Sequence, residues 1–189
     1  VDGARLASAL TTPGNDVDLA LLSTEADAFY IGGTKNGALL GEALVIVNPA
    51  LRTEFRHVIK QRGAMLAKGM VVGAQFEALF EDGLYFVLAT HANVMAERLR
   101  EVLQQAGVPL AVDSPSNQLF PVLPNAVVER LREQVEFEIW ERRGDGTTVI
   151  RLMTSWLTPE SAIEAFAAIF AALYGDGLSA RQESPAKGA

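Results

Sequence analysis

The sequence contains no cysteine and only two histidines, His57 and His91. The lack of cysteine excludes disulfide bonds and thiolate metal ligands. Two isolated histidines also argue against a histidine-based zinc site. Both lie in segments with a helical pattern, where we expect them to be partly packed surface residues.

A hydrophobic run of membrane-spanning length is missing as well. The apolar stretch 165–174 is shorter than the roughly 18 residues that a transmembrane helix needs, so we expect a buried helix there. Asp2 and Arg5 stand where the apolar core of a signal peptide would begin, which argues against such a peptide. The expected compartment is the cytoplasm.

An excess of positive charge is also absent. The formal net charge is -7 with a pI near 4.9, and the basic residues are scattered, which argues against binding to nucleic acid or to an anionic membrane. The mean hydropathy of +0.18 is high for a soluble monomer. It indicates a large subunit interface or a face that packs against further chain.

The first part of the chain is predicted to alternate strands and helices. Residues 1–3 resemble the end of a strand, and residues 28–31 form another. Residues 44–47 have the short apolar pattern of a buried strand in a parallel sheet. Helices are expected over 48–61, where Asn48-Pro49 provides a start signal, and over 68–80.

A long amphipathic helix is predicted over 84–106, with Gly107 at its C-terminal cap. The pattern beyond it is α+β, with strands over 119–123, 135–141 and 148–154 and helices over 125–133 and 159–173. We therefore expect a large-domain part (1–83), a connecting helix (84–107), a small α+β domain (108–175) and a frayed tail (176–189). The predicted fold class is α/β, followed by this small domain.

The most informative group of residues comprises Asp2, Arg5, Thr34 and Lys35. Lys35 follows a short strand and is ringed by glycines, at the kind of sheet edge where α/β proteins bind ligands. Desolvation there would lower the pKa of its amine and allow a Schiff base to form. Asp2, at the end of its own strand, suits the carboxylate that pyridoxal phosphate (PLP) needs against its ring nitrogen. Each motif alone has a simpler explanation, because Gly-Gly-Thr-Lys can be an ordinary turn and Asp a helix cap.

The chain resembles the threonine aldolases of the β-eliminating lyase group, which are PLP enzymes of the aspartate-aminotransferase fold (fold type I). The resemblance covers the chain up to its tail, and its most specific parts are Val1-Asp2-Gly3-Ala4-Arg5-Leu6 and the segment from Phe29 to Ala38. Further matching segments are 41–43, 60–63, 116–118 and 151–156. The resemblance implies a partial large domain of this fold with its C-terminal small domain, hence the C-terminal half of such an enzyme.

The resemblance also implies roles for individual residues. Lys35 would form the internal aldimine, Asp2 would pair with the pyridinium nitrogen, and Thr34 would contact the phosphate. Arg5 would lie beside the cofactor and help to fix the substrate or the ring oxygen. Arg151 would bind the α-carboxylate of the substrate, although its strand pattern alone slightly favours a solvent-facing arginine between core residues.

Three further positions are left open between two interpretations. Lys60 and Arg62 could reach a phosphate, but a basic helix end that complements the helix dipole is the simpler explanation. Asn117 could touch the substrate or cap a turn.

The implied activity is cleavage of the Cα–Cβ bond of β-hydroxy-α-amino acids, such as threonine to glycine and acetaldehyde. Alternatives are a PLP-dependent β-eliminating lyase, an aminotransferase, or a catalytically incomplete structural or interaction domain. The phosphate-binding loop and the ring-stacking residue of the family have no counterpart in these residues, so we expect activity to need the missing N-terminal half. The resemblance also implies a homodimer or homotetramer.

Overall fold

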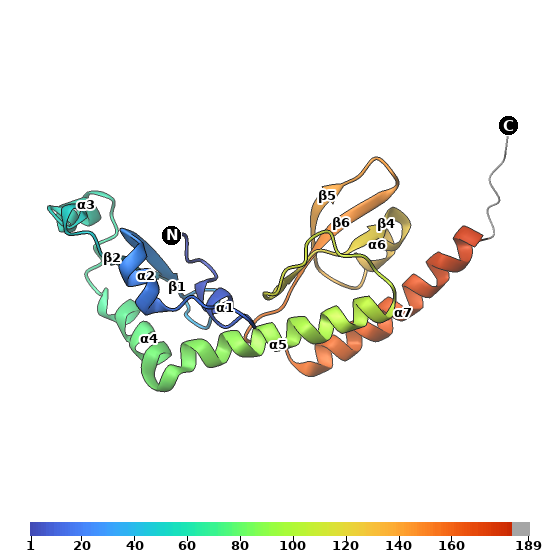
Figure 1. The fold of residues 1–189 in the computed structure, drawn as a ribbon, viewed down its shortest axis with the longest axis horizontal. Helices are drawn as coiled ribbons and strands as arrows, with labels where there is room; N and C mark the ends of the chain where they lie inside the picture. The colour runs from blue at the N-terminus through green and yellow to red at the C-terminus, as the bar shows by residue number, and fades with distance from the viewer. Residues whose placement is uncertain (183–189) are drawn as a thin grey trace. The chain divides into compact units, whose positions relative to one another are not determined.

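The computed structural model describes residues 1–182 (Figure 1). The chain divides into two compact units, Val1–His91 (unit 1) and Ala92–Ala189 (unit 2), and the division falls within helix α5 (Leu84–Gln105). Each unit has its own hydrophobic core. No helix among the described residues combines the length and apolar character needed to cross a membrane.

Unit 1 is built on a two-stranded antiparallel ribbon, β1 (Ala28–Gly32) and β2 (Glu42–Ile46). Its helices are α1 (Leu6–Leu10), α2 (Leu19–Glu25), η1 (Pro49–Leu51), α3 (Phe55–Gln61), α4 (Met70–Phe80), η2 (Glu81–Gly83) and the first part of α5. Phe29 and Ile31 of β1 pack with Leu79, Tyr85 and Ala89 in the core. The ribbon thus holds the segment after β1 against the start of α5.

The antiparallel pairing corrects the prediction of a parallel strand at 44–47. Gly32 is paired with Glu42 and Ala28 with Ile46. The connection 33–41 is shorter than the dozen or so residues that a parallel crossover requires, so the chain can only turn back. The apolar run of β2 reflects a half-buried strand with an exposed Leu44.

Residues 1–3 are not assigned as a strand, but they bond to β1 as a parallel strand would. The Val1 amino group donates to the Ala28 carbonyl at 2.8 Å, and Tyr30 N–H donates to the Val1 carbonyl at 3.3 Å. Gly32 N–H donates to the Gly3 carbonyl at 2.9 Å. Val1 bonds to the residues on both sides of Phe29, as in a parallel ladder, so Val1 lies beside Phe29 and Asp2 beside Tyr30.

The single helix predicted over 48–61 is wrong, because the chain forms two helices there. Asn48 does act as a cap, accepting from Ala50 N–H at 2.9 Å, and Pro49 opens η1. Glu54 then adopts φ 58°, in the left-handed region that ends a helix, and α3 starts at Phe55. The predictions for α4 and α5 are confirmed to within two residues, and Gly107 at φ 71° follows α5 as its cap.

Unit 2 is a four-stranded sheet in which β6 (Thr147–Met153) pairs antiparallel with every other strand. The others are β3 (Gln118–Leu119), β4 (Val122–Pro124) and β5 (Glu138–Arg142). The strand predicted over 119–123 is therefore interrupted, since Pro121 has no N–H to donate to a ladder.

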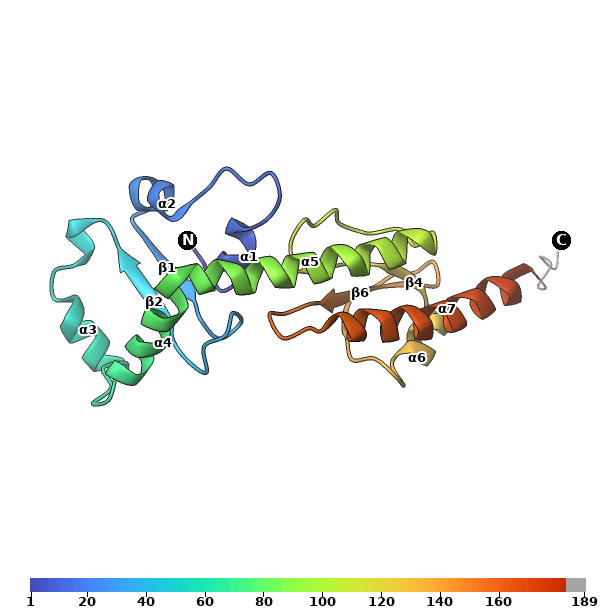
Figure 2. The same ribbon diagram turned by 90° about the horizontal axis from the view of Figure 1, so that it is seen from below.

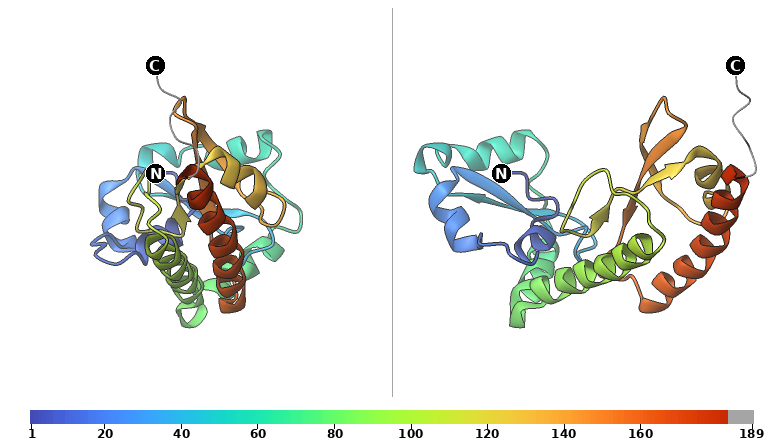
Figure 3. Two further views of the ribbon diagram at one scale, coloured as in Figure 1. Left: turned by 90° about the vertical axis from the view of Figure 1, so that its right-hand side faces the viewer. Right: turned by 45° about the vertical axis from the view of Figure 1, so that its right-hand side comes forward.

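Helices cover one face of this sheet. The second half of α5 and α7 (Glu160–Gln182) lie side by side in Figure 2, and both views of Figure 3 place them on the same side of β6. Leu103 of α5, Ile150 of β6 and Phe170 of α7 are almost fully buried in the core, which α6 (Asn125–Leu131) completes. Because α7 continues to Gln182, the tail expected over 176–189 does not begin at residue 176: the glycines there weaken a helix without forbidding it. Residues 183–189 lie outside the described part.

Candidate functional site

Two glycine-containing motifs touch each other in unit 1, and this contact builds the site. A Cβ on Gly3 would lie 1.6 Å from the Tyr30 carbonyl oxygen, and a Cβ on Gly32 would lie 2.6 Å from the Ala4 carbonyl oxygen. Any larger side chain would force the two backbones apart. The glycines therefore let Asp2 and Lys35, far apart in sequence, be held on neighbouring segments.

Asp2 is an exposed carboxylate with two donors on one oxygen. Its Oδ1 accepts from Ala4 N–H at 3.1 Å and from the hydroxyl of Tyr30. The hydrogen bond from Tyr30, followed by the one from Ala4, lowers the pKa of Asp2, and the positive charge of Lys35 lowers it further. The side chain is therefore ionised at neutral pH, within electrostatic reach of Lys35.

The loop that carries Lys35 is fixed by hydrogen bonds to Tyr85 at the start of α5. Asn36 is buried, and its Nδ2 donates to the Tyr85 carbonyl at 2.7 Å, while the Tyr85 hydroxyl donates to the Gly32 carbonyl at 3.2 Å. Burial raises the pKa of Tyr85 to about 12, so this hydroxyl stays protonated. Thr34 and Lys35, at the tip of the loop, are exposed.

Lys35 is exposed within residues 1–182, so no described residue desolvates it, and its desolvation stays a prediction for the complete protein. The glycines around it do not open space for its side chain but bring the backbone close to other residues. A Cβ on Gly33 would lie 2.8 Å from the Phe76 ring, and one on Gly37 would lie 2.9 Å from Leu88. The described residues therefore form the floor beneath the loop and leave its tip uncovered.

The other basic candidates of unit 1 lie at helix ends. Arg5 is half-buried immediately before α1, and its carbonyl accepts from Ala9 N–H at 3.1 Å. Lys60 and Arg62 are exposed at the end of α3, where basic residues complement the helix dipole.

Arg151 belongs to unit 2, on β6 directly opposite Glu138 of β5. Its Nη2 donates to the Glu138 carboxylate and its Nη1 to Gln118 Oε1 at 3.4 Å, and its guanidinium lies 5.5 Å from the centre of the Trp140 ring. Its Nε is buried and has no hydrogen-bond partner among the described residues. The expectation that its neighbours Ile150 and Leu152 face the core is confirmed.

Arg151 also lines a groove of about 560 Å³. The other lining residues are Arg132, Val135, Glu136, Phe137, Glu138 and Met153. The groove is open, and its charged residues are of both signs. Arg151 is therefore neither a freely solvated arginine nor a core residue, but a cation held by hydrogen bonds in a groove lined by charged and apolar side chains.

Asn117 is buried and serves the end of β6. Its Nδ2 donates to the Thr154 carbonyl at 2.7 Å, and its own carbonyl accepts from Thr154 N–H at 3.1 Å. These two bonds extend the antiparallel pairing of β3 with β6 by one residue, so they join two strands rather than cap a local turn.

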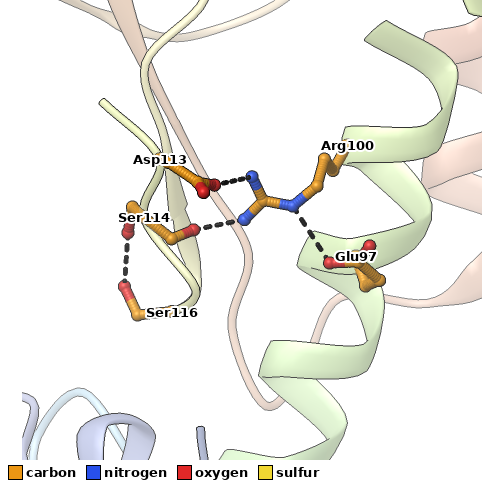
Figure 4. Close-up of polar contacts among 5 residues, drawn as sticks. All are labelled: Glu97, Arg100, Asp113, Ser114 and Ser116. Atoms are coloured by element: carbon orange, nitrogen blue, oxygen red, sulfur yellow. Dashed lines mark hydrogen bonds and ion pairs between the residues drawn. The ribbon is translucent and has the colours of Figure 1, made fainter. Parts of the chain in front are cut away.

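Sequence reasoning missed the buried cation Arg100. Figure 4 shows its side chain reaching from α5 to the segment 113–116. Its Nε donates to the Glu97 carboxylate at 3.0 Å, its Nη1 donates to the Asp113 carboxylate at 3.3 Å, and its Nη2 donates to the Ser114 carbonyl. The guanidinium thus fixes the segment that leads into Asn117 and Gln118. The available signal was its place beside the apolar stripe of α5, one residue after Leu99.

The chain is similar in sequence to known threonine aldolases. No family model matches the chain. A Pseudomonas sp. protein described as a low specificity L-threonine aldolase is 31% identical over 169 residues, covering 89% of this chain and 48% of that protein. A Pseudomonas aeruginosa protein of the same description is 30% identical over 159 residues, covering 84% of this chain and 45% of that protein.

Solved structures agree. The threonine aldolase of Leishmania major superposes with a TM-score of 0.89 at 47% identity, over 92% of this chain and 51% of that one. Serine palmitoyltransferase of Sphingomonas wittichii shares the fold alone, with a TM-score of 0.62 at 14% identity over 85% of this chain and 42% of its own. The fold is thus part of the α/β fold of the PLP-dependent enzymes of fold type I. Within that class the chain belongs to the threonine aldolase family, and it spans about half the length of the curated relatives it matches.

Proposed function

We propose that this chain supplies the lysine-bearing part of the active site of a PLP-dependent carbon–carbon lyase. The complete protein would split β-hydroxy-α-amino acids such as threonine into glycine and an aldehyde. The observation that carries this proposal is the contact between the two glycine motifs, which holds the ionised Asp2 and the loop of Lys35 on neighbouring segments.

The residues present fit two contacts of the cofactor. Asp2 accepts both of its hydrogen bonds through Oδ1. Within the described residues Oδ2 therefore has no partner and is available to a protonated ring nitrogen. Lys35 offers an exposed amine on a fixed loop, next to the exposed hydroxyl of Thr34, which we assign to the phosphate. When bound, PLP withdraws electrons from the α-carbon of the amino acid and so eases the breaking of a bond to that carbon.

Arg151 is our candidate for holding the α-carboxylate of the amino acid, and Arg5 for assisting at the ring or the substrate. A planar guanidinium suits a carboxylate because it offers two parallel N–H donors. Glu138 occupies the guanidinium of Arg151 but is 59% exposed, against 17% for Arg151. The carboxylate of the substrate would take the place of Glu138, which can turn into solvent.

The remaining walls of the pocket are proposed to come from further chain or from a second subunit. Lys35 is exposed, and the chain spans about half the length of its curated relatives. The phosphate loop, the ring-stacking group and the base for the β-hydroxyl are therefore unassigned. The exposed tip also keeps one other candidate open, a non-catalytic module that does not bind the cofactor.

The test uses the full-length protein, with any chain beyond these 189 residues, supplied with PLP. After borohydride reduction, peptide mapping should find the mass of the cofactor on the peptide that contains Lys35, and threonine should yield glycine. Lys35→Ala should lose both results, whereas Lys68→Ala, at another exposed lysine, should keep them. Labelling of Lys35→Ala at the wild-type level would refute the anchor, and conversion of threonine without release of glycine would favour elimination or transamination.

A further inference from the structure

Tyr30 has no role in the function proposed above, yet it stands directly beside Asp2. The parallel bonding of residues 1–3 to β1 puts Val1 next to Phe29 and Asp2 next to Tyr30. Side chains alternate between the two faces of a strand, so Asp2 and Tyr30 share the face opposite to the buried Phe29 and Ile31. The register of the backbone thus fixes this pair.

The hydroxyl of Tyr30 determines how the Asp2 carboxylate is turned. It donates to Oδ1, the same oxygen that accepts from Ala4 N–H at 3.1 Å. Two donors from different segments on one oxygen fix the rotation of the carboxylate about its χ angles. Within residues 1–182, Oδ2 accepts no hydrogen bond.

We propose that Tyr30 is a positioning residue, which locks the Asp2 carboxylate through Oδ1 so that Oδ2 receives the N–H of the cofactor ring. This inference rests on the proposed function, and it adds a residue that acts on the cofactor only through Asp2. A phenylalanine at position 30 would fill the same place on β1, opposite Leu44 of β2, but could not hold the carboxylate.

The charges around the pair support this arrangement. The hydrogen bond to Asp2 raises the pKa of Tyr30, and the negative charge of Glu42 on β2 raises it further. The same hydrogen bond is the main cause of the lowered pKa of Asp2, to which the hydrogen bond from Ala4 and the charge of Lys35 also contribute. At neutral pH the phenol is therefore a donor and the carboxylate an ionised acceptor. The hydrogen bond that positions Asp2 is thus formed in the pH range where the enzyme would work.

The first test needs no cofactor. The carboxyl carbon of Asp2 is titrated by NMR in the chain and in Tyr30→Phe. We expect the substitution to raise the pKa of Asp2 toward its ordinary value. Tyr174→Phe, which removes the phenol of a partly buried residue packed against the core of unit 2, should leave the titration unchanged. An unchanged pKa of Asp2 in Tyr30→Phe would refute the proposal that Tyr30 holds the Asp2 carboxylate.

The second test uses the full-length protein with PLP. Tyr30→Phe should still attach the cofactor at Lys35 but should lower kcat roughly tenfold, the loss typical of residues that orient a metal ligand by a hydrogen bond, with KM for threonine changed by no more than about twofold. The pH dependence of the visible band of the bound cofactor should shift in Tyr30→Phe and stay unchanged in Tyr174→Phe. If the variant matches wild type in both respects, Tyr30 has no positioning role although the proposed function stands. If wild type takes up no PLP, the proposed function fails and the inference about the cofactor fails with it.

Discussion

Gly3 is the residue on which the contact between the two motifs depends most directly. Because a Cβ there would lie 1.6 Å from the Tyr30 carbonyl oxygen, Gly3→Ala must displace backbone rather than a flexible side chain. We expect the free energy of unfolding to fall by about 1–3 kcal/mol, the usual cost of overpacking. Urea titration measures it, and Gly144→Ala, at a glycine with no atom within 4 Å of the added carbon, serves as control. Equal stability of the two variants would show that residues 1–3 do not need this approach.

For single residues, the sequence predicts which side chains are candidates for the site better than it predicts their burial and contacts. Asp2 and Lys35 could be identified because each stands in a motif with glycines at fixed positions. The exposure of Lys35 could not, since burial depends on chain that is distant in sequence. Tyr30 and Arg100 escaped for a similar reason: a tyrosine on a strand and an arginine on a helix are common, and only the fold supplies the carboxylates they contact.

Among the elements, the loop between β1 and β2 is fixed by one buried amide. Asn36 Nδ2 donates to the Tyr85 carbonyl at the start of α5, and Asn36→Ala leaves that buried carbonyl without this donor. We expect a loss of about 1–3 kcal/mol in unfolding free energy, together with faster amide exchange over residues 33–38. Asn15→Ala, whose exposed side chain bonds to the Leu10 and Val17 carbonyls, should cost less than about 1 kcal/mol. Unchanged exchange at Ala38 in Asn36→Ala would contradict this account.

Elements with a long, regular pattern were predictable, and those shaped by one residue were not. Helix α5 follows from its amphipathic period and from Gly107. The break at Glu54 was not foreseeable, because glutamate rarely adopts a positive φ. The direction of β2 could have been predicted from the short connection 33–41, but its apolar composition suggested a parallel strand instead.

At the scale of the whole molecule, the chain contains the candidate site residues of a threonine aldolase over about half the length of its curated relatives. The candidate residues are distributed over both units, with Asp2, Arg5, Thr34 and Lys35 in unit 1 and Arg151 in unit 2. The motifs in the sequence were sufficient to predict the family, since each is local. A complete pocket was not predictable, because the chain spans about half the length of its curated relatives.

The two cores make a separate prediction about stability. Leu103 is fully buried among residues of unit 2 alone, and none of these residues belongs to the core of unit 1. Leu103→Ala should therefore lower the free energy of opening of β6 and α6 by about 2–5 kcal/mol, as other buried leucine truncations do. Leu157→Ala, at a leucine that is 67% exposed, should change it by less than about 0.5 kcal/mol. Native-state amide exchange measures both effects, and the amides of β1 and β2 should keep their protection. If they lose as much as β6, the two cores unfold as one cooperative body.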